Sequence, residues 1–128
     1  MADEVGAVTL VVPAATDHIR FVRLVVAGLA AKVGFDYDAI EDLRIAVHEL
    51  CAHLIGLAAT EASLYLIVVG RGAELGVSAQ VAQAPGRERG MDPLVEQIAA
   101  AVVDEFEVRS DGLLASFRLR KQLQGDRA

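Results

Sequence analysis

The sequence has no tryptophan, a single cysteine and few aromatic residues, which make up 5% of its 128 residues. Because Cys51 is alone, no disulfide can form within the chain. A core without tryptophan has to be built from Val, Leu, Ile and Ala, and hydrophobic residues amount to 54% of the chain. This length and composition predict one domain over residues 1–128, with residues 123–128 as a flexible tail.

Clusters of positive charge are also missing, and the formal net charge is −6. Contact with the phosphates of DNA or RNA needs clustered Lys and Arg, so no nucleic acid is expected as a ligand. No apolar run approaches the roughly 20 residues of a membrane span. The first residues, "MADEVGAV", carry acids where a signal peptide has Lys or Arg. We therefore expect a soluble, cytoplasmic protein that binds no membrane.

The hydrophobic pattern predicts the element order β-α-α-β-β-α-β-β. One helix is expected from an N-cap at Thr16 or Asp17 to about Val33, a second after an N-cap at Asp36, and a third from Pro93 to about Val102. Strands are expected over 8–12, 62–69, 73–81, 104–110 and 113–123. The simplest packing is an α+β two-layer sandwich, with the helices on one face of a mostly antiparallel sheet.

Alternation within the strands predicts which side chains face the core. The strand over 62–69 is apolar on both faces. Its second face, with Tyr65, Ile67 and Val69, needs a cover such as a subunit or a partner. In the strand over 113–123, four side chains are expected to point inward: Leu113, Ala115, Phe117 and Leu119.

The stretch "AVHELCAHLI", residues 46–55, holds two of the three histidines, the cysteine and a glutamate. Zinc sites of the H-E-x-x-H type have histidines four apart. His48 and His53 are five apart, so on a helix they point about 140° apart. Neither a metal site nor a catalytic Cys51 is expected, because a buried cysteine is mostly unreactive. Glu49 and His53 are four apart, a spacing that a plain solvated helix face also explains.

Three stretches resemble a known family: "RFVRLVVAGLAAKVGFDYDAIEDLRIAVHELCAHLI", "VVDEFEV" and "LLASFRLRKQL". They look like the bacterial anti-sigma factor serine kinases, which have the gyrase, histidine-kinase and MutL type of ATPase fold. In that family a glutamate beside the nucleotide is taken as the base in phosphotransfer, and an asparagine four residues later binds magnesium. The resemblance assigns the glutamate to Glu49. His53 stands at the asparagine position, and its imidazole lacks the oxygen that Mg²⁺ prefers.

The family's glycine boxes are also altered. An Asp-x-Gly-x-Gly box is replaced by "VAQAP", with Val81 at the Asp position and Gln83 at the first Gly. In the phosphate-cradling box, Pro93 removes a backbone donor and Val95 blocks close approach. The lid between the boxes is reduced to "GRERG". These changes predict a pocket that has lost its nucleotide, so no cofactor is expected unless the chain is an active kinase that binds ATP and Mg²⁺.

The resemblance also implies protein partners. Family members sequester a sigma factor, are released by an anti-anti-sigma factor with a STAS-type domain, and act as dimers through sheet edges. An arginine in an F-x-R context belongs to their partner-binding surface. Arg23 of Phe21-Val22-Arg23 matches it, and Arg20 lies one turn earlier on the same side. A plain solvated helix face would also explain both arginines.

The resemblance therefore implies an anti-sigma factor of the bacterial stress response, a homodimer with lost or weak ATP binding. Two alternatives stay open. One is an active ATP-dependent serine kinase that phosphorylates the STAS-type partner. The other is a non-catalytic scaffold for a second kinase-like subunit.

Overall fold

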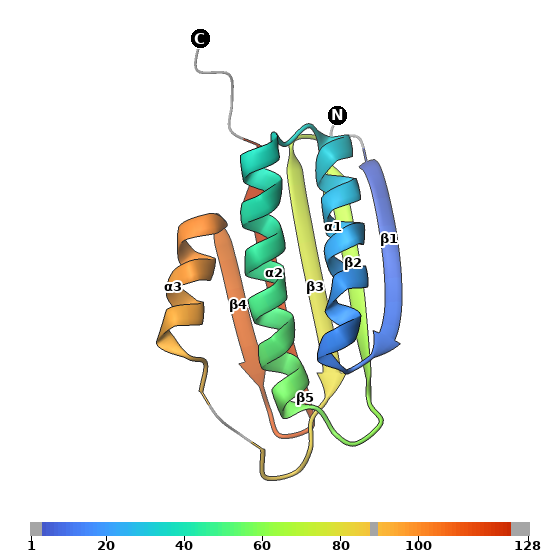
Figure 1. Ribbon diagram of the computed structural model, residues 1–128, viewed down its shortest axis with the longest axis vertical. Helices are drawn as coiled ribbons and strands as arrows, with labels where there is room; N and C mark the ends of the chain where they lie inside the picture. Colours follow the sequence, from blue (N-terminus) through green and yellow to red (C-terminus); the bar gives the residue numbers. More distant parts are fainter. Residues whose placement is uncertain (1–3, 88–89, 124–128) are drawn as a thin grey trace.

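The computed structural model of the chain describes residues 4–87 and 90–123, and its element order confirms the predicted β-α-α-β-β-α-β-β (Figure 1). The strands are β1 (Glu4–Pro13), β2 (Ser63–Arg71), β3 (Glu74–Ala82), β4 (Glu105–Ser110) and β5 (Leu114–Gln122). The helices are η1 (Thr16–His18, a 3-10 turn), α1 (Ile19–Val33), α2 (Tyr37–Leu57) and α3 (Pro93–Val102). The predicted tail lies outside the described residues apart from Leu123.

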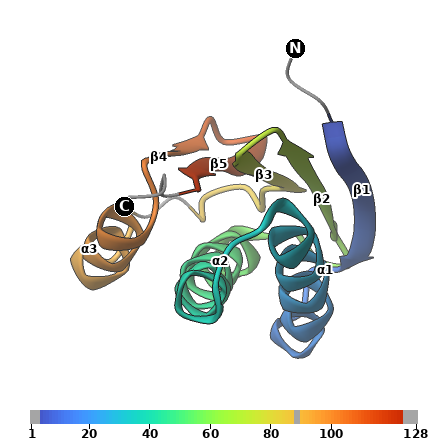
Figure 2. The ribbon, with the colours of Figure 1, turned by 90° about the horizontal axis from the view of Figure 1, so that it is seen from above.

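The strands form one sheet in the order β1-β2-β3-β5-β4, and each neighbouring pair is antiparallel. Figure 2 shows α1, α2 and α3 on the same face of this sheet, with α2 between the other two. Within residues 4–87 and 90–123, no helix covers the opposite face, which we call the outer face. The predicted two-layer α+β sandwich is therefore confirmed.

The helix α2 lays one apolar row along the middle of the sheet. The row has the alternating spacing of three and four seen in the sequence, and its members are each at most 1% exposed: Leu43, Val47, Leu50, Leu54 and Leu57. Fully burying one such side chain contributes about 1.5–3 kcal/mol. Together these side chains fix the rotation of α2 about its axis, and so they decide which residues face α1, α3 and solvent.

Two glycines let α1 approach the sheet closely. A Cβ atom at Gly70 of β2 would lie 2.7 Å from Cγ2 of Val33, and one at Gly6 of β1 would lie 2.9 Å from Cδ1 of Leu29. Real Cβ atoms do not come so near, because interiors are already closely packed. Any larger residue at these two positions would push the C-terminal part of α1 away from the strands.

The helix ends test the capping predictions. Asp36 caps α2 as predicted, since its Oδ1 accepts a 2.8 Å hydrogen bond from the backbone N of Ala39. The prediction for α1 is wrong, because Thr16 and Asp17 form the turn η1 instead. His18 then precedes the helix and makes no side-chain capping bond.

The inward position predicted for Leu113 is also wrong. Leu113 is 77% exposed, because β5 begins one residue later. Asp111 causes this shift: its Oδ1 accepts hydrogen bonds of 2.8 Å from the backbone N atoms of both Leu113 and Leu114. The backbone bonds from Leu114 and Leu113 also lower the pKa of the Asp111 carboxyl. Further along β5, the inward positions of Ala115, Phe117 and Leu119 are confirmed.

Gln83, just beyond β3, ties that end of the sheet to the turn between β4 and β5. It is 5% exposed. Its side-chain Oε1 accepts hydrogen bonds from Oγ of Ser110 at 2.8 Å and from N of Gly112 at 3.2 Å. Its backbone N donates to O of Leu113 at 2.9 Å. The side chain thus holds a hairpin turn that local sequence alone would leave mobile.

We predict that Gln83→Ala lowers the free energy of unfolding by about 2 kcal/mol, because it leaves two donors of the hairpin turn without an acceptor. Urea unfolding followed by circular dichroism measures the change. Gln80→Ala, on the same strand but exposed, is the matched control and should change stability by less than about 0.5 kcal/mol. Equal losses of unfolding free energy in the two variants would contradict a stabilising role of the Gln83 side chain.

Candidate functional site

The exposed surface of α1 carries the arginine and aromatic residues that the sequence singled out. Phe21 is 39% exposed and Leu24 is 67% exposed. The guanidinium of Arg20 lies over the Phe21 ring, 5.2 Å from its centroid. Such a cation–π contact keeps an arginine extended over apolar surface while it stays charged and accessible. This part of α1 therefore combines positive charge with exposed apolar area.

Arg23 lies differently from Arg20, because it is half-buried and turned toward α2. Its NH1 lies 2.5 Å from Nδ1 of His48. The two side chains help to line a shallow cavity of about 250 Å³, together with Glu41, Arg44, Ile45 and Glu49. Arg44 and Glu41 form an ion pair of 2.7 Å within α2. The sequence predicted that Arg20 and Arg23 lie on the same side of the helix. In the structure Arg20 is exposed, whereas Arg23 is held against α2.

The polar cluster predicted on α2 separates into different environments. Glu49 lines the same cavity as Arg23, and His53 is half-buried further along the helix. Cys51 is fully buried, and burial raises the pKa of its thiol to about 12. This thiol stays protonated at neutral pH and is a poor nucleophile. Within residues 4–87 and 90–123, no group of three His, Cys, Asp or Glu side chains is placed to hold a metal ion.

The two positions that the resemblance assigns to the adenine-binding box are both buried. Val81, at the place of the family's Asp, is fully buried among the inner side chains of β3. Gln83, at the place of the first Gly, is engaged with Ser110 and Gly112. An adenine amino group needs an acceptor and open space at these positions. Here Val81 offers only methyl groups, and the Oε1 acceptor of Gln83 is already used by Ser110 and Gly112.

The N-terminus of α3 holds the positions that the resemblance assigns to the phosphate-cradling box. Pro93 is its first residue and has no backbone donor, and Val95 packs against the core. The N–H of Leu94 is taken by the Oδ1 of Asp92 at 2.8 Å. Asp92 thus places a carboxylate where a phosphate would bind, which satisfies the free donor and repels an anion. The predicted lid "GRERG" lies partly outside the described residues.

The outer face of the sheet is divided into an apolar half and a charged half. On β1 and β2, three neighbouring side chains are about half exposed: Val11 at 50%, Tyr65 at 51% and Ile67 at 48%. The strand register pairs Val11 with Tyr65 and Thr9 with Ile67, so these side chains form one continuous patch, which we call the apolar patch. The second apolar face predicted for β2 is therefore present and uncovered by the described elements.

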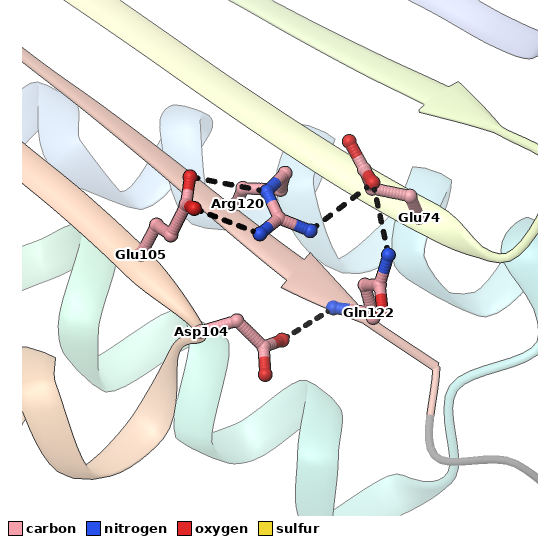
Figure 3. A network of polar contacts seen from close by, with 5 residues as sticks. All are labelled: Glu74, Asp104, Glu105, Arg120 and Gln122. Carbon is pink, nitrogen blue, oxygen red and sulfur yellow. Dashed lines mark hydrogen bonds and ion pairs between the residues drawn. The ribbon is translucent and has the colours of Figure 1, made fainter.

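The charged half of the outer face consists of ion pairs within the chain. Figure 3 shows Arg120 of β5 between Glu105 of β4 and Glu74 of β3, at 3.1 and 3.3 Å. The hydrogen bond and charge of Arg120 lower the pKa of Glu105. The side-chain N of Gln122 also donates to Glu74, and its backbone N donates to Asp104 at 2.6 Å. These contacts hold β3, β5 and β4 together and line a cavity of about 710 Å³.

Glu107 of β4 extends this charged half, pairing with Arg109 at 2.7 Å and with Arg118 at 3.6 Å. Arg109, Arg118 and Arg120 therefore all have acidic partners in the same sheet. Alternation in the sequence indicated that Glu107, Arg109, Arg118 and Arg120 point outward, but the pairs depend on the register of β4 and β5. The contact between Arg23 and His48 was missed for a similar reason, since no pattern in the sequence sets how α1 lies on α2.

The comparisons with known proteins support the resemblance seen in the sequence. No family model matches the chain. The chain is 38% identical over 55 residues to the serine-protein kinase RsbW of Bacillus velezensis, and 34% identical over 55 residues to those of Bacillus thuringiensis and Bacillus anthracis. Each match covers 43% of this chain and 34% of the relative, so the matched segment spans about a third of the relatives' length.

No helix within residues 4–87 and 90–123 is long and apolar enough to cross a membrane. The matched segment and the α+β architecture with its antiparallel sheet agree with the same family. Over this segment the chain is similar to the bacterial serine-protein kinases named RsbW.

Proposed function

We propose that the chain is a cytoplasmic anti-sigma factor that captures a sigma factor by protein–protein binding and has lost its nucleotide. The exposed surface of α1 supports the binding half of this proposal. It offers Arg20 and Phe21 in a stacked arrangement, Leu24 beside them and Arg23 held against α2. In a chain with a net charge of −6, this local combination of arginine and apolar area suits an acidic, apolar helix face of a partner.

The N-terminus of α3 is the observation that carries the second half of the proposal. The carboxylate of Asp92 accepts the N–H of Leu94 at 2.8 Å, in the place where the family cradles phosphate. A nucleotide would have to displace this capping bond and bring its own negative charge against the carboxylate. Val81 in the core adds a second obstacle, because it offers no acceptor to adenine.

Glu49 is the feature that favours the alternative, an active serine kinase acting on a STAS-type anti-anti-sigma factor. The residue is retained and half-buried on α2. A carboxylate in this position is a base only when a nucleotide and its magnesium lie beside it, and His53 replaces the magnesium ligand. The third reading, a scaffold for another kinase-like subunit, would use the same exposed faces without capturing a sigma factor.

We predict that isothermal titration calorimetry with Mg-ATP gives no binding signal for this chain. His53→Asn, which restores the family's magnesium ligand, should also give none, because Val81 and Asp92 still obstruct the base and the phosphates. The serine-protein kinase RsbW of Bacillus velezensis serves as the positive control. A dissociation constant in the micromolar range for the unmodified chain would support the kinase alternative instead.

We predict that Arg23→Glu weakens capture of the sigma factor at least tenfold, because it reverses the charge of an arginine in the proposed surface. The tagged chain is incubated with host lysate, the recovered sigma factor is identified by mass spectrometry, and its affinity is measured by biolayer interferometry. Lys32→Glu makes the same charge change at the far end of α1 and should leave the affinity within about twofold. Unchanged capture by Arg23→Glu would remove Arg23 from the interface.

We further propose that the chain forms a homodimer through the apolar patch, which includes part of the edge strand β1. The charged side chains of β3, β4 and β5 form ion pairs with one another within the chain. The charged half therefore offers little attraction to a partner surface that is purely acidic or purely basic. A second copy presents the same apolar side chains to Val11, Tyr65 and Ile67, which is the self-complementarity that a two-fold interface requires.

We predict that Ile67→Arg converts the dimer into a monomer, because it places a charge at the centre of the buried interface. Sedimentation velocity at several protein concentrations reports the change. Leu113→Arg is the matched control: Leu113 is 77% exposed in the turn between β4 and β5, away from the apolar patch, and its substitution should leave the dimer intact. A monomeric unmodified chain at high concentration would refute this interface.

A further inference from the structure

His48 makes a contact that depends on its protonation state. Its Nδ1 lies 2.5 Å from NH1 of Arg23. A guanidinium can only donate, so Nδ1 has to be the acceptor and cannot carry a proton. This hydrogen bond therefore requires the tautomer that carries its proton on Nε2. The contact joins α2 to α1.

The charged groups around this contact come from both helices. Arg23 faces His48 from α1, while Glu41, Arg44 and Glu49 line the same cavity from α2. Glu41 is already paired with Arg44. Glu49 follows His48 directly in the sequence, and consecutive side chains on a helix do not face each other. Among these groups, His48 is the one whose ring nitrogen lies within hydrogen-bond distance of the Arg23 guanidinium.

The geometry assigns to His48 the role of positioning residue for partner capture, an inference that rests on the proposed anti-sigma function. Held by Nδ1, Arg23 keeps one orientation at the edge of the proposed surface and loses less rotamer freedom when a partner binds. Protonation of His48 removes the acceptor and puts a second positive charge beside the guanidinium. Arg23 is then released, so the surface binds its partner less well in mildly acidic solution.

The capture experiment compares the sigma factor recovered from host lysate on three chains at pH 7.5 and pH 6.0. The unmodified chain should bind more weakly at the lower pH, by up to about tenfold, which is the size expected for complete loss of one hydrogen bond to a charged group. His48→Asn provides an amide oxygen near the position of Nδ1 and cannot be protonated. It should keep most of the affinity and lose the pH dependence.

His48→Ala has no acceptor and should bind weakly at both pH values. Because the sigma factor is the same in each measurement, its own titration affects the three chains equally. A His48→Asn profile that follows the unmodified chain, or full affinity of His48→Ala at pH 7.5, would overturn the role of His48. Circular dichroism melting curves check that each variant is folded.

A measurement without the partner separates this inference from the proposed function. Long-range ¹H–¹⁵N spectra of the histidine rings report the tautomer directly. At pH 7.5 His48 should show an unprotonated Nδ1, and Arg23→Ala should shift that resonance. A protonated Nδ1 would overturn the inference even if the sigma factor is captured. Failure of every chain to capture a sigma factor, with the predicted tautomer present, would refute the proposed function and the positioning role in it.

Discussion

The burial of the apolar row of α2 against the sheet is the interaction on which the remaining structure depends. This row fixes the rotation of α2, and with it the direction of every other side chain on that helix. His48 is turned toward α1 and meets Arg23, while Glu49 and Ile45 line the cavity open to solvent. A rotation of one residue, about 100°, would move His48 away from α1 and bury a polar side chain in the core.

The same tight packing supports the proposed loss of the nucleotide. Binding a nucleotide requires open space, unused hydrogen-bond partners and a positive potential at the phosphates. Val81 fills space, the Oε1 of Gln83 is used by the β4–β5 turn, and the carboxylate of Asp92 reverses the local charge. Each change also stabilises the fold locally, through burial, a hydrogen-bonded tie or a helix cap. A protein that needs this domain only for binding partners gains stability from such changes.

Much of the fold could be predicted from the sequence, because regular patterns decide it. The apolar residues from Leu43 to Leu57 recur every three or four positions, and this spacing indicates the buried face of α2. Leu113 was misplaced because a side chain, Asp111, sets where β5 starts. Contacts between distant segments could not be derived from local patterns. The bonds of Gln83 to Ser110 and Gly112 require β3 and β5 to be neighbours, and the Arg23–His48 pair requires α1 and α2 to pack side by side.

The two proposed surfaces lie on opposite sides of the molecule, and this arrangement makes them compatible. The arginine-bearing surface of α1 belongs to the helical layer, whereas the apolar patch lies on the outer face of the sheet (Figure 2). In a dimer joined through outer faces, the helical layers of both copies point away from the interface. Each copy can then bind a partner without breaking the dimer, and protonation of His48 would act on each surface separately. The strands β1 and β2, which carry the apolar patch, are paired along their whole lengths, and β2 is paired in turn with β3. We therefore expect partner binding and dimerisation to be energetically independent, since coupling between two sites requires an element whose equilibrium both of them shift.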